Sequence, residues 1–340
     1  MRGDVLSLLD KYSLGLSDFL EKFKEGKVIS RIQYQRELLA SLIEHYIRCL
    51  DFFKNLDEYP QGPEKVFVFL PGNVPVVPFQ LLPLLLVSGV KEVFLKYPRR
   101  ENHFYDSLFY VLNAHLKENL KLEGAYLEHT EALERAKNYN FVIGFGGENL
   151  RLAFEAIKVP GKFFGPKFSV GILKEGYTFE MLEGIAWDNL AFDTKGCLSL
   201  SVLFTFDRDI REGLYHAFEK VSEILTPESD FRFDEIEYEV YRNFQYFKAV
   251  RRGKNYFLVF SENFVPISAP RTLQVVEVSS MDEVEDFIKK YNPYLQGIAT
   301  NTQFLPENNA SMITSFGKLQ FTPCSWFFEK GVNYKNFWEV

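Results

Sequence analysis

Two residues of this 340-residue chain have side chains and surroundings suited to chemistry, Asn73 and Cys197. Asn73 is the one polar side chain in the loop 71–78, which otherwise consists of proline, glycine and valine. Cys197 follows the polar, glycine-containing run 193–196 and precedes an apolar segment. We expect its thiol to lie in a turn or in the first turn of a helix, where the dipole lowers a thiol pKa and favours the nucleophilic thiolate. A plain buried cysteine is the competing interpretation.

A third candidate is a group of glycines, Gly144, Gly146 and Gly147, between an apolar strand expected at 141–145 and a helix that begins near Glu148. Glycine allows a backbone to approach a phosphate or a ring closely, and a helix N-terminus favours negative charge. Glycines between a strand and a helix also serve packing alone. The pattern therefore indicates either a nucleotide site or an ordinary tight turn.

The loop that carries Asn73 belongs to a predicted β-α-β unit. Residues 66–90 contain no charge, but four prolines in this stretch would break a membrane-spanning helix. We expect strands at 66–70 and 92–96 around a helix at 79–88, because both strands are continuously apolar, as a buried parallel sheet requires. Asn73 then lies at the carboxyl end of the first strand, where open α/β sheets bind ligands.

The rest of the chain predicts a second domain after a mostly helical N-terminus. Periodic apolar positions indicate helices in 1–56 and in 209–225, and an apolar strand is expected at 168–173. Residues 229–280 alternate polar and apolar groups, including EIEYEVY, NYFLVF and TLQVVEV, which is typical of strands. A short helix with acidic residues first and basic residues last is expected at 281–291.

Composition narrows the classes of partner and compartment. The net charge of −7, with lysine and arginine interspersed among acidic residues, argues against a nucleic-acid partner. Three cysteines, Cys49, Cys197 and Cys324, are too few for a disulfide framework and fit a reducing cytoplasm. Cys49 lies on an apolar helical stripe and is expected to be a buried small hydrophobe. The N-terminus does not read as a signal peptide, and no Cys/His spacing predicts a metal.

The order of these sites resembles the aldehyde dehydrogenase superfamily. There, a lysine follows the loop asparagine by the 23 positions that separate Asn73 from Lys96 here. Gly165-Pro166-Lys167, which ends 30 positions before Cys197, is similar to the superfamily's Gly-Gly-Lys segment. The resemblance runs from about Phe67 to the C-terminus. It implies an α/β fold with a Rossmann-like parallel-sheet cofactor domain and an α/β catalytic domain that carries the nucleophilic cysteine.

Within the superfamily the chain most resembles LuxC-type acyl-CoA reductases, the type known from bacterial luminescence. The motifs LPGNVP at 70–75, GCLSLS at 196–201 and RTLQVVEV at 271–278 carry this resemblance. The implied domains are a helical segment with a nucleotide-binding domain, a catalytic domain, and a C-terminal segment that returns to the cofactor domain or forms an oligomer interface. Their expected bounds are 1–168, 169–308 and 309–340.

The resemblance implies that Cys197 attacks an acyl thioester, with Asn73 and the Cys197 backbone N–H holding the oxyanion. Lys96 and Arg99 would anchor the adenosine end of the cofactor, and the glycines Gly144, Gly146 and Gly147 would lie close to its pyrophosphate or ring. Aldehyde-oxidising relatives carry a glutamate where residues 162–164 read Lys-Phe-Phe, so the acyl-enzyme is expected to be reduced rather than hydrolysed. Arg99 stands where NAD-preferring members often have glutamate, which favours NADPH over NADH.

Three other functions stay open at this stage. One is reduction of an acyl phosphate, as in glutamate-5-semialdehyde dehydrogenase. Another is CoA-acylating oxidation of an aldehyde, and the last is a non-catalytic subunit. The acyl donor is expected to be acyl-CoA or an acyl-loaded partner such as an acyl-activating synthetase. A cytoplasmic homo-oligomer, with contacts through the aromatic C-terminal region, is the expected form.

Overall fold

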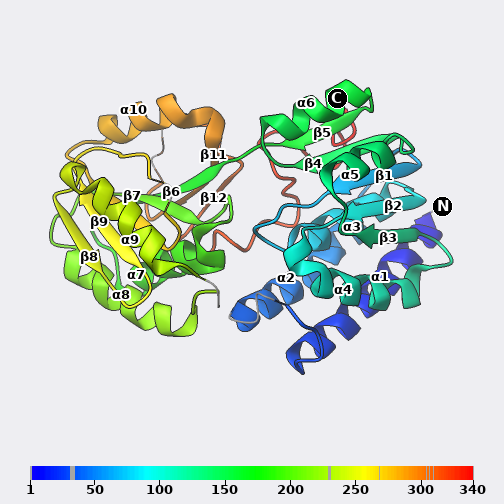
Figure 1. Cartoon of the computed structure of the whole chain (residues 1–340), viewed down its shortest axis with the longest axis horizontal. Coiled ribbons are helices and arrows are strands. Elements are labelled where there is room, and N and C mark those ends of the chain that lie inside the picture. Colours follow the sequence, from blue (N-terminus) through cyan, green and yellow to red (C-terminus); the bar gives the residue numbers. More distant parts are fainter. Residues whose placement is uncertain are drawn as a thin grey trace. The chain divides into compact units, whose positions relative to one another are not determined.

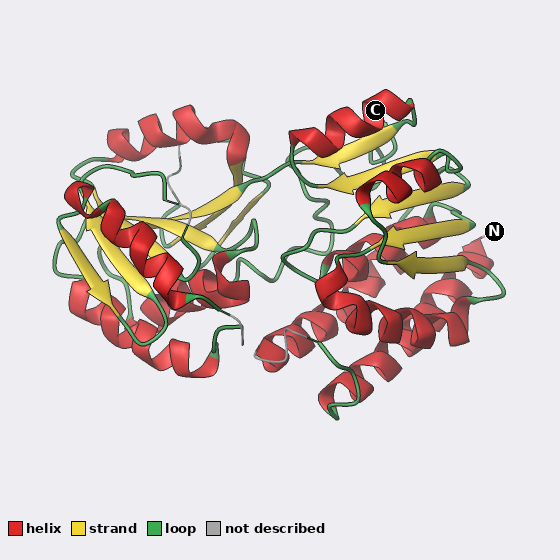
Figure 2. Cartoon of the chain, viewed as in Figure 1, coloured by secondary structure: helices red, strands yellow, loops and turns green. Residues whose placement is uncertain are grey.

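The chain forms two compact units, each built on its own sheet (Figure 1). The computed structural model describes residues 2–30, 35–228, 231–267, 269–303, 305, 307–308 and 310–339. Unit 1 comprises Met1–Pro166, Pro323–Phe327 and Val332–Val340, and unit 2 comprises Lys167–Thr322 and Phe328–Gly331. In both units helices lie on the faces of a mostly parallel sheet (Figure 2). The predicted α/β class is confirmed.

Unit 1 contains a five-stranded parallel sheet in the order β3-β2-β1-β4-β5. The chain builds outward from β1 to β3 on one side and then returns to add β4 and β5 on the other. The order therefore reverses between β1 and β4, the position at which doubly wound sheets open a crevice for ligands. The strands are β1 Lys65–Phe69, β2 Glu92–Lys96, β3 Lys121–Ala125, β4 Phe141–Phe145 and β5 Gly161–Phe164.

Helices cover both faces of this sheet (Figure 1). Alternate strand residues Phe67, Phe69 and Phe94 share one core cluster with Ala132 of α5 and Phe154 of α6. The opposite layer contains α1, α2, α3 and α4, where phenylalanine rings from different helices meet edge to face. The helices are α1 Arg2–Lys24, α2 Arg36–Lys54, α3 Val77–Val87, α4 Asn102–Leu116, α5 His129–Ala136 and α6 Glu148–Ile157, with the 3-10 turn η2 Arg99–Glu101.

The last residues of the chain complete unit 1. Cys324 forms a disulfide with Cys49 of α2, 275 positions away. The Gln80 amide of α3 donates to the Trp326 carbonyl, and the Trp338 indole N–H donates to Ser88 Oγ at 3.0 Å. Cys49 is buried, as expected, but it is not a simple hydrophobe, because it is part of a disulfide that the sequence analysis missed. No local pattern marked it, because two distant segments supply the partners.

Unit 2 contains a seven-stranded sheet in the order β12-β11-β6-β7-β10-β9-β8, parallel except where β8 meets β9. The helix α10 packs its buried Phe287 and Ile288 on the same cluster as Val202 of β7 and Val276 of β10. The strands are β6 Phe168–Leu173, β7 Leu200–Thr205, β8 Ala249–Arg252, β9 Phe257–Ser261, β10 Thr272–Glu277, β11 Leu295–Thr300 and β12 Met312–Thr314. The helices are α7 Phe179–Leu190, α8 Arg211–Ile224, α9 Phe233–Arg242 and α10 Met281–Tyr291, with 3-10 turns η3 Ala191–Thr194, η4 Phe244–Tyr246 and η5 Asn292–Tyr294.

One secondary-structure prediction is wrong. The segment EIEYEVY, expected as a strand, lies within the helix α9. Ile236 and Val240, four residues apart, are buried against Phe257 and Val259 of β9, while Tyr238 between them is 68% exposed. The apolar residues of this seven-residue segment fit the period of a strand and also that of a helix. Ile236 and Val240, four residues apart, lie on the same face of a helix, and the helix is the structure that forms. No helix in the described part of the chain is long and apolar enough to cross a membrane.

Candidate active site

Cys197 lies in a turn between η3 and β7, at the amino end of that strand. Of the chain's three cysteines, all within the described residues, it alone carries a free thiol. No helix begins at this turn, so the expected lowering of the pKa by a helix dipole is wrong. Burial raises the pKa of the Cys197 thiol to about 11, although the backbone N–H groups of Cys197 and Leu198 and the nearby Lys167 ammonium oppose the shift. The free thiol is protonated at neutral pH.

The backbone that leads into this turn is held in an unusual conformation. Phe192, Asp193 and Thr194 have φ values of 51°, 55° and 60° in succession. The left-handed region costs a non-glycine residue roughly 1–3 kcal/mol, so three in a row require strong local contacts. Strain of this kind persists only where the surrounding structure fixes it, which makes the neighbours of the segment informative.

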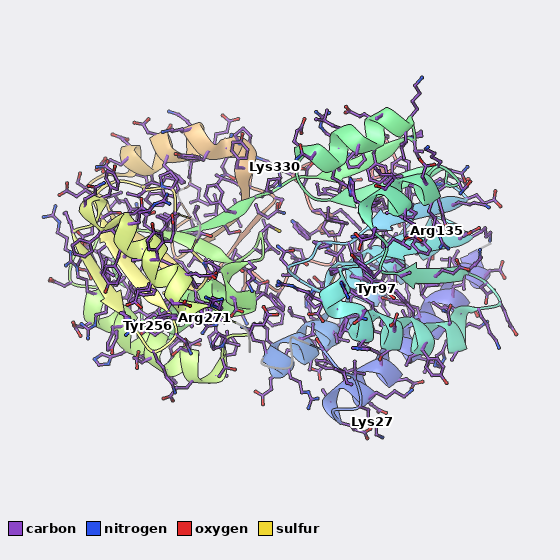
Figure 3. All side chains as sticks on the ribbon, viewed as in Figure 1. Lys27, Tyr97, Arg135, Tyr256, Arg271 and Lys330 are labelled. Atoms are coloured by element: carbon purple, nitrogen blue, oxygen red, sulfur yellow. A yellow bond between two sulfur atoms is a disulfide. The ribbon has the colours of Figure 1, made fainter. Side chains whose placement is uncertain are left out.

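The strongest of these contacts is a fully buried ion pair. Arg271 Nη1 donates to Asp193 Oδ1 at 2.9 Å, and both side chains have no exposed surface. The guanidinium of Arg271, which Figure 3 labels, also donates to the Asn255 carbonyl, to Asn255 Oδ1 and to the Leu225 carbonyl at 2.7–2.8 Å. Its own backbone N–H donates to Thr194 Oγ1 at 3.0 Å. Arg271 thus fixes two of the three strained residues at once.

Hydroxyl and amide side chains fix the other end of the turn. Ser169 Oγ of β6 donates to the Cys197 carbonyl at 2.9 Å, and Ser199 Oγ donates to the Ala191 carbonyl at 3.0 Å. The buried Asn189 amide donates to the Leu200 carbonyl at 2.7 Å. These contacts place the nucleophile candidate on a rigid support. The sequence showed Arg271 only as part of a motif and gave no sign of this network.

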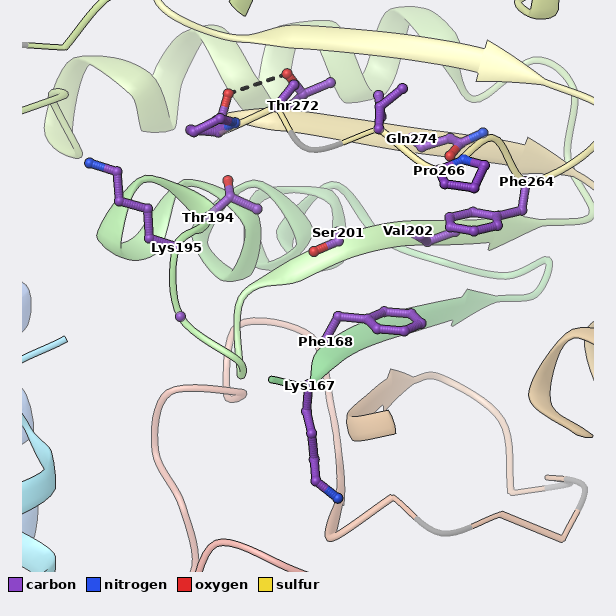
Figure 4. Close-up of a pocket in the computed structure, with 14 residues that line it drawn as sticks. Lys167, Phe168, Thr194, Lys195, Ser201, Val202, Phe264, Pro266, Thr272 and Gln274 are labelled. Atoms are coloured by element: carbon purple, nitrogen blue, oxygen red, sulfur yellow. Dashed lines mark hydrogen bonds between the residues drawn. The ribbon is translucent and has the colours of Figure 1, made fainter. Parts of the chain in front are cut away.

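A cavity of about 560 Å³ adjoins the Cys197 turn (Figure 4). Thr194, Lys195 and Gly196 line one end of it, directly before the cysteine in the chain. Phe264 and Pro266 lie at the opposite end, beside Gln274. Both lysines at the cavity are paired, Lys195 with Glu228 at 2.9 Å and Lys167 with Glu329 at 3.2 Å. Polar side chains therefore occur at both ends of the cavity, Thr194 and Lys195 at one and Gln274 at the other.

The candidate cofactor residues of unit 1 gather at the carboxyl edge of its sheet. Lys96 ends β2 and Arg99 begins η2, and their charged groups lie 5.9 and 6.0 Å from the centre of the Tyr126 ring, which follows β3. Partial burial lowers the pKa of Lys96, while the Glu128 carboxylate opposes that shift. Arg99 is exposed. Two cations at the end of parallel strands suit a phosphate-bearing ligand.

Asn73 lies in the bend that follows β1 and is exposed. A Cβ placed on the neighbouring Gly72 would come within 3.8 Å of Pro98, just before Arg99. The Asn73 loop and the β2–η2 connection therefore run close together at this edge of the sheet. This neighbourhood is the one that the reversal of strand order predicts.

The three glycines have different roles in the structure. A Cβ on Gly144 would meet the Phe163 ring at 2.6 Å, so packing favours glycine there, whereas one on Gly146 would meet only the movable end of Leu150 at 2.9 Å. Gly147 is the N-cap of α6, and a Cβ there would meet nothing within 4 Å. Space for a close ligand is therefore found at Gly147. In the described part of the chain no group of three His, Cys, Asp or Glu side chains is placed to hold a metal.

Comparisons with known proteins agree with this architecture. A family model described as acyl-CoA reductase (LuxC) matches residues 7–318. Aldehyde dehydrogenase 21 from Physcomitrella patens, solved with the reaction product succinate, is 11% identical over 98% of this chain and 81% of its own, with a TM-score of 0.73. A putative methylmalonate-semialdehyde dehydrogenase from Sinorhizobium meliloti, solved with NAD, is 12% identical over 99% and 84%, with a TM-score of 0.73.

An oxidoreductase from Marinobacter aquaeolei has a TM-score of 0.75 at 10% identity, over 98% of this chain and 81% of its own. Identities this low establish the fold alone, which is that of the aldehyde dehydrogenases. No curated protein sequence matches this chain.

Proposed function

Since the chain belongs to the LuxC family of acyl-CoA reductases, we propose that it reduces an acyl thioester to an aldehyde through an acyl-Cys197 intermediate. The observation that supports this most directly is the support beneath Cys197. A free thiol follows three residues of strained backbone that a buried ion pair holds in place. A cysteine that merely filled space would need no such support.

In the acylation step, Cys197 Sγ forms a bond to the thioester carbonyl carbon as the bond from that carbon to the coenzyme A sulfur breaks. The proton of the Cys197 thiol passes to the departing thiolate, so the step is balanced without an external base. The Cys197 backbone N–H and the Asn73 amide are the proposed donors to the oxyanion, and one such donor contributes about 3–4 kcal/mol to transition-state stabilisation.

The acyl-enzyme is proposed to await reduction because the glutamate that aldehyde-oxidising relatives use as a base has no counterpart at residues 162–164. Phe163 stands in the region where aldehyde-oxidising relatives carry glutamate, and its ring packs against Phe154 at 5.5 Å between ring centres. Lys162 beside it donates to the Asn336 carbonyl. Neither side chain can activate a water molecule as a carboxylate does. The thioester is then consumed by reduction or by a returning thiol.

A bound NADPH would supply a hydride to the carbonyl carbon of the acyl thioester; the carbon–sulfur bond to Cys197 would then break to give the aldehyde, and the thiolate would take a proton from water. The carboxyl edge of the unit 1 sheet fits such a cofactor, because Lys96 and Arg99 offer cations and Gly147 leaves open space at the start of α6. Arg99 is the residue proposed to favour a 2′-phosphate. Glu128, beside Lys96, would favour a ribose hydroxyl instead, so the preference for NADPH depends on Arg99.

The decisive experiment is intact-protein mass spectrometry after incubation with acyl-CoAs in the absence of nicotinamide. An acyl adduct at Cys197, discharged by NADPH as aldehyde, is the expected result. Cys197→Ala should give no adduct and no aldehyde while its NADPH affinity stays unchanged. An adduct from acyl phosphates alone would indicate an acyl-phosphate reductase. A protein that forms no adduct and binds no nucleotide would be a non-catalytic subunit.

The same preparation tests the wider setting that we propose, a homo-oligomer supplied with acyl groups by an acyl-activating synthetase. Loading of Cys197 by an acylated synthetase, but not by acyl-CoA, would make the partner the direct donor. Sedimentation of the purified protein as a monomer would contradict the oligomer.

A further inference from the structure

One covalent bond and several weaker contacts fasten the C-terminal segment to unit 1. The disulfide joins Cys49 of α2 to Cys324, which lies 275 positions later in the chain. Close by in the sequence, the Phe327 ring meets Phe53 of the same helix edge to face, with ring centres 6.2 Å apart. This ring contact does not depend on the bond. Reduction of the disulfide would therefore loosen the segment without removing it from α2.

The two sulfurs of this disulfide differ in their access to solvent. Cys49 is 3% exposed and belongs to the core of unit 1. Cys324 is only half-buried, and the residues on either side of it, Pro323 and Ser325, are exposed. A disulfide opens when a thiolate attacks one of its sulfurs, and the rate depends on which sulfur the thiolate can reach. An external thiol therefore attacks Cys324, and Cys49 is the sulfur that leaves.

The sulfur that leaves has a hydrogen-bonding neighbour on its own helix. His45 precedes Cys49 by one turn of α2, and its Nε2 atom is 3.6 Å from Cys49 Sγ. An imidazole with a proton on Nε2 can donate that proton in a hydrogen bond to a thiolate. A nearby histidine lowers the pKa of a thiol, and a leaving thiol of lower pKa departs faster. His45 is half-buried, so its ring can exchange protons with water.

We infer that the bond between Cys49 and Cys324 is a thiol-exchange site, which a dithiol reductant opens by attack at Cys324. In the first step, a thiolate of the reductant forms a bond to Cys324 Sγ as the bond from that atom to Cys49 Sγ breaks. Cys49 leaves as a thiolate and takes a proton from His45 or from water.

In the second step, the other thiolate of the reductant attacks the reductant's own sulfur in the mixed disulfide. The bond from that sulfur to Cys324 breaks, Cys324 leaves as a thiolate that takes a proton from water, and the reductant becomes a disulfide. Two electrons have then passed from the reductant to the pair of cysteines, and an oxidised dithiol reverses both steps. This site is separate from Cys197 and does not depend on the proposed function.

The direction of attack is tested with glutathione, a monothiol that stops at the mixed disulfide. The full-length protein is treated with an oxidised dithiol to close the bond, mixed with glutathione and quenched with acid at early times. Peptide mapping at low pH should find glutathione on Cys324 and a free thiol on Cys49, with any adduct on Cys197 counted separately. Glutathione chiefly on Cys49, or a bond that does not close, would overturn this inference.

The role of His45 is tested by the rate at which dithiothreitol reduces the closed bond. His45→Phe keeps a ring but removes the donor, and it should slow reduction on the order of tenfold because the leaving thiol then has a higher pKa. His45→Gln keeps a donor and should retain most of the rate. His129→Phe, at an exposed position of α5 on the opposite face of the sheet, is the control. Equal rates in the two phenylalanine variants would overturn the part of the inference that concerns His45.

Opening of the site should also change the stability of the chain. A bond between residues 275 positions apart restricts the unfolded chain, so reduction should lower the midpoint of urea unfolding. A double variant, Cys49→Ser with Cys324→Ser, should unfold at the midpoint of the reduced protein whether or not a reductant is present. A wild-type midpoint that does not respond to reduction would show that the bond fastens nothing, and it would overturn this consequence of the exchange.

Discussion

In unit 1 the candidate residues follow the carboxyl ends of parallel strands, whereas in unit 2 Cys197 precedes the amino end of β7. Asn73 and Arg99 of the first group are exposed and lie on ordinary turns, a bend and a short 3-10 turn. Cys197, in contrast, is surrounded by backbone with positive φ, by a buried ion pair and by a hydrogen bond from the Ser169 hydroxyl. Binding a flexible cofactor tolerates loosely held groups, but placing a nucleophile requires a rigid support.

The largest expected difference concerns stability. Arg271→Met leaves the Asp193 carboxylate buried without its partner, so it should lower the free energy of unfolding by about 3–5 kcal/mol. Arg99→Met in unit 1, where the guanidinium is exposed, should change it by about 0.5 kcal/mol or less. Urea unfolding of the full chain measures both. Equal, small losses in the free energy of unfolding would show that the buried ion pair near Cys197 is no more important for stability than an exposed arginine.

A milder variant separates support of the turn from global stability. Thr194→Val removes the hydroxyl that accepts from the Arg271 backbone and donates to Asn189, but it leaves the ion pair intact. It should slow the acylation of Cys197 while the midpoint of urea unfolding stays nearly unchanged. A variant with normal acylation would limit the network to a structural role.

The next effect tests whether the exposed residues of unit 1 only bind. Asn73→Ala should reduce the acylation rate of Cys197 by roughly 10²–10³-fold, because one oxyanion donor is lost, with little change in NADPH affinity. Single-turnover acylation without nicotinamide is the appropriate measurement. A variant that binds NADPH more weakly but acylates normally would mean that Asn73 serves cofactor binding only. The residues of unit 1 would then bind, and those of unit 2 alone would take part in acylation.

The raised pKa of the Cys197 thiol predicts a particular pH dependence. Because the pKa of Cys197 is raised to about 11, the thiolate fraction, and with it the rate of alkylation by iodoacetamide, should grow about tenfold for each pH unit from 7 to 10. Mapping the label by peptide mass keeps the paired cysteines out of the measurement. A plateau near pH 8 would mean that the turn activates the free thiol after all.

The smallest expected effect concerns cofactor choice. Arg99→Glu should reduce the preference for NADPH over NADH about fivefold, since an exposed cation near a phosphate contributes about 1 kcal/mol. Arg100→Glu, at the exposed neighbouring position, is the matched control and should change the preference less. Equal effects from both variants would mean that Arg99 contributes only positive charge to this region and makes no specific contact with the 2′-phosphate.

The sequence predicted well what depends on local pattern. The strands β2, β4 and β6 and the helix α10 have the predicted bounds, because each is a continuous apolar run or a strongly amphipathic segment between clear breaks. The polar contacts around Cys197 could not be predicted in this way. Asp193 and Arg271 are 78 positions apart, and an ion pair at that separation leaves no periodic trace. The helix dipole expected at the thiol failed because a strand, not a helix, follows the turn.

The C-terminal segment has a consequence for biosynthesis. Domains usually fold during translation in the order in which they leave the ribosome. Unit 1 begins the chain, yet it includes Pro323–Phe327 and Val332–Val340, which are made after nearly all of unit 2. Until those residues emerge, the surfaces that receive Trp326 and Trp338 stay uncovered and Cys49 has no partner. A ribosome that stalls late in the message would therefore release a chain whose first-made unit is the unfinished one.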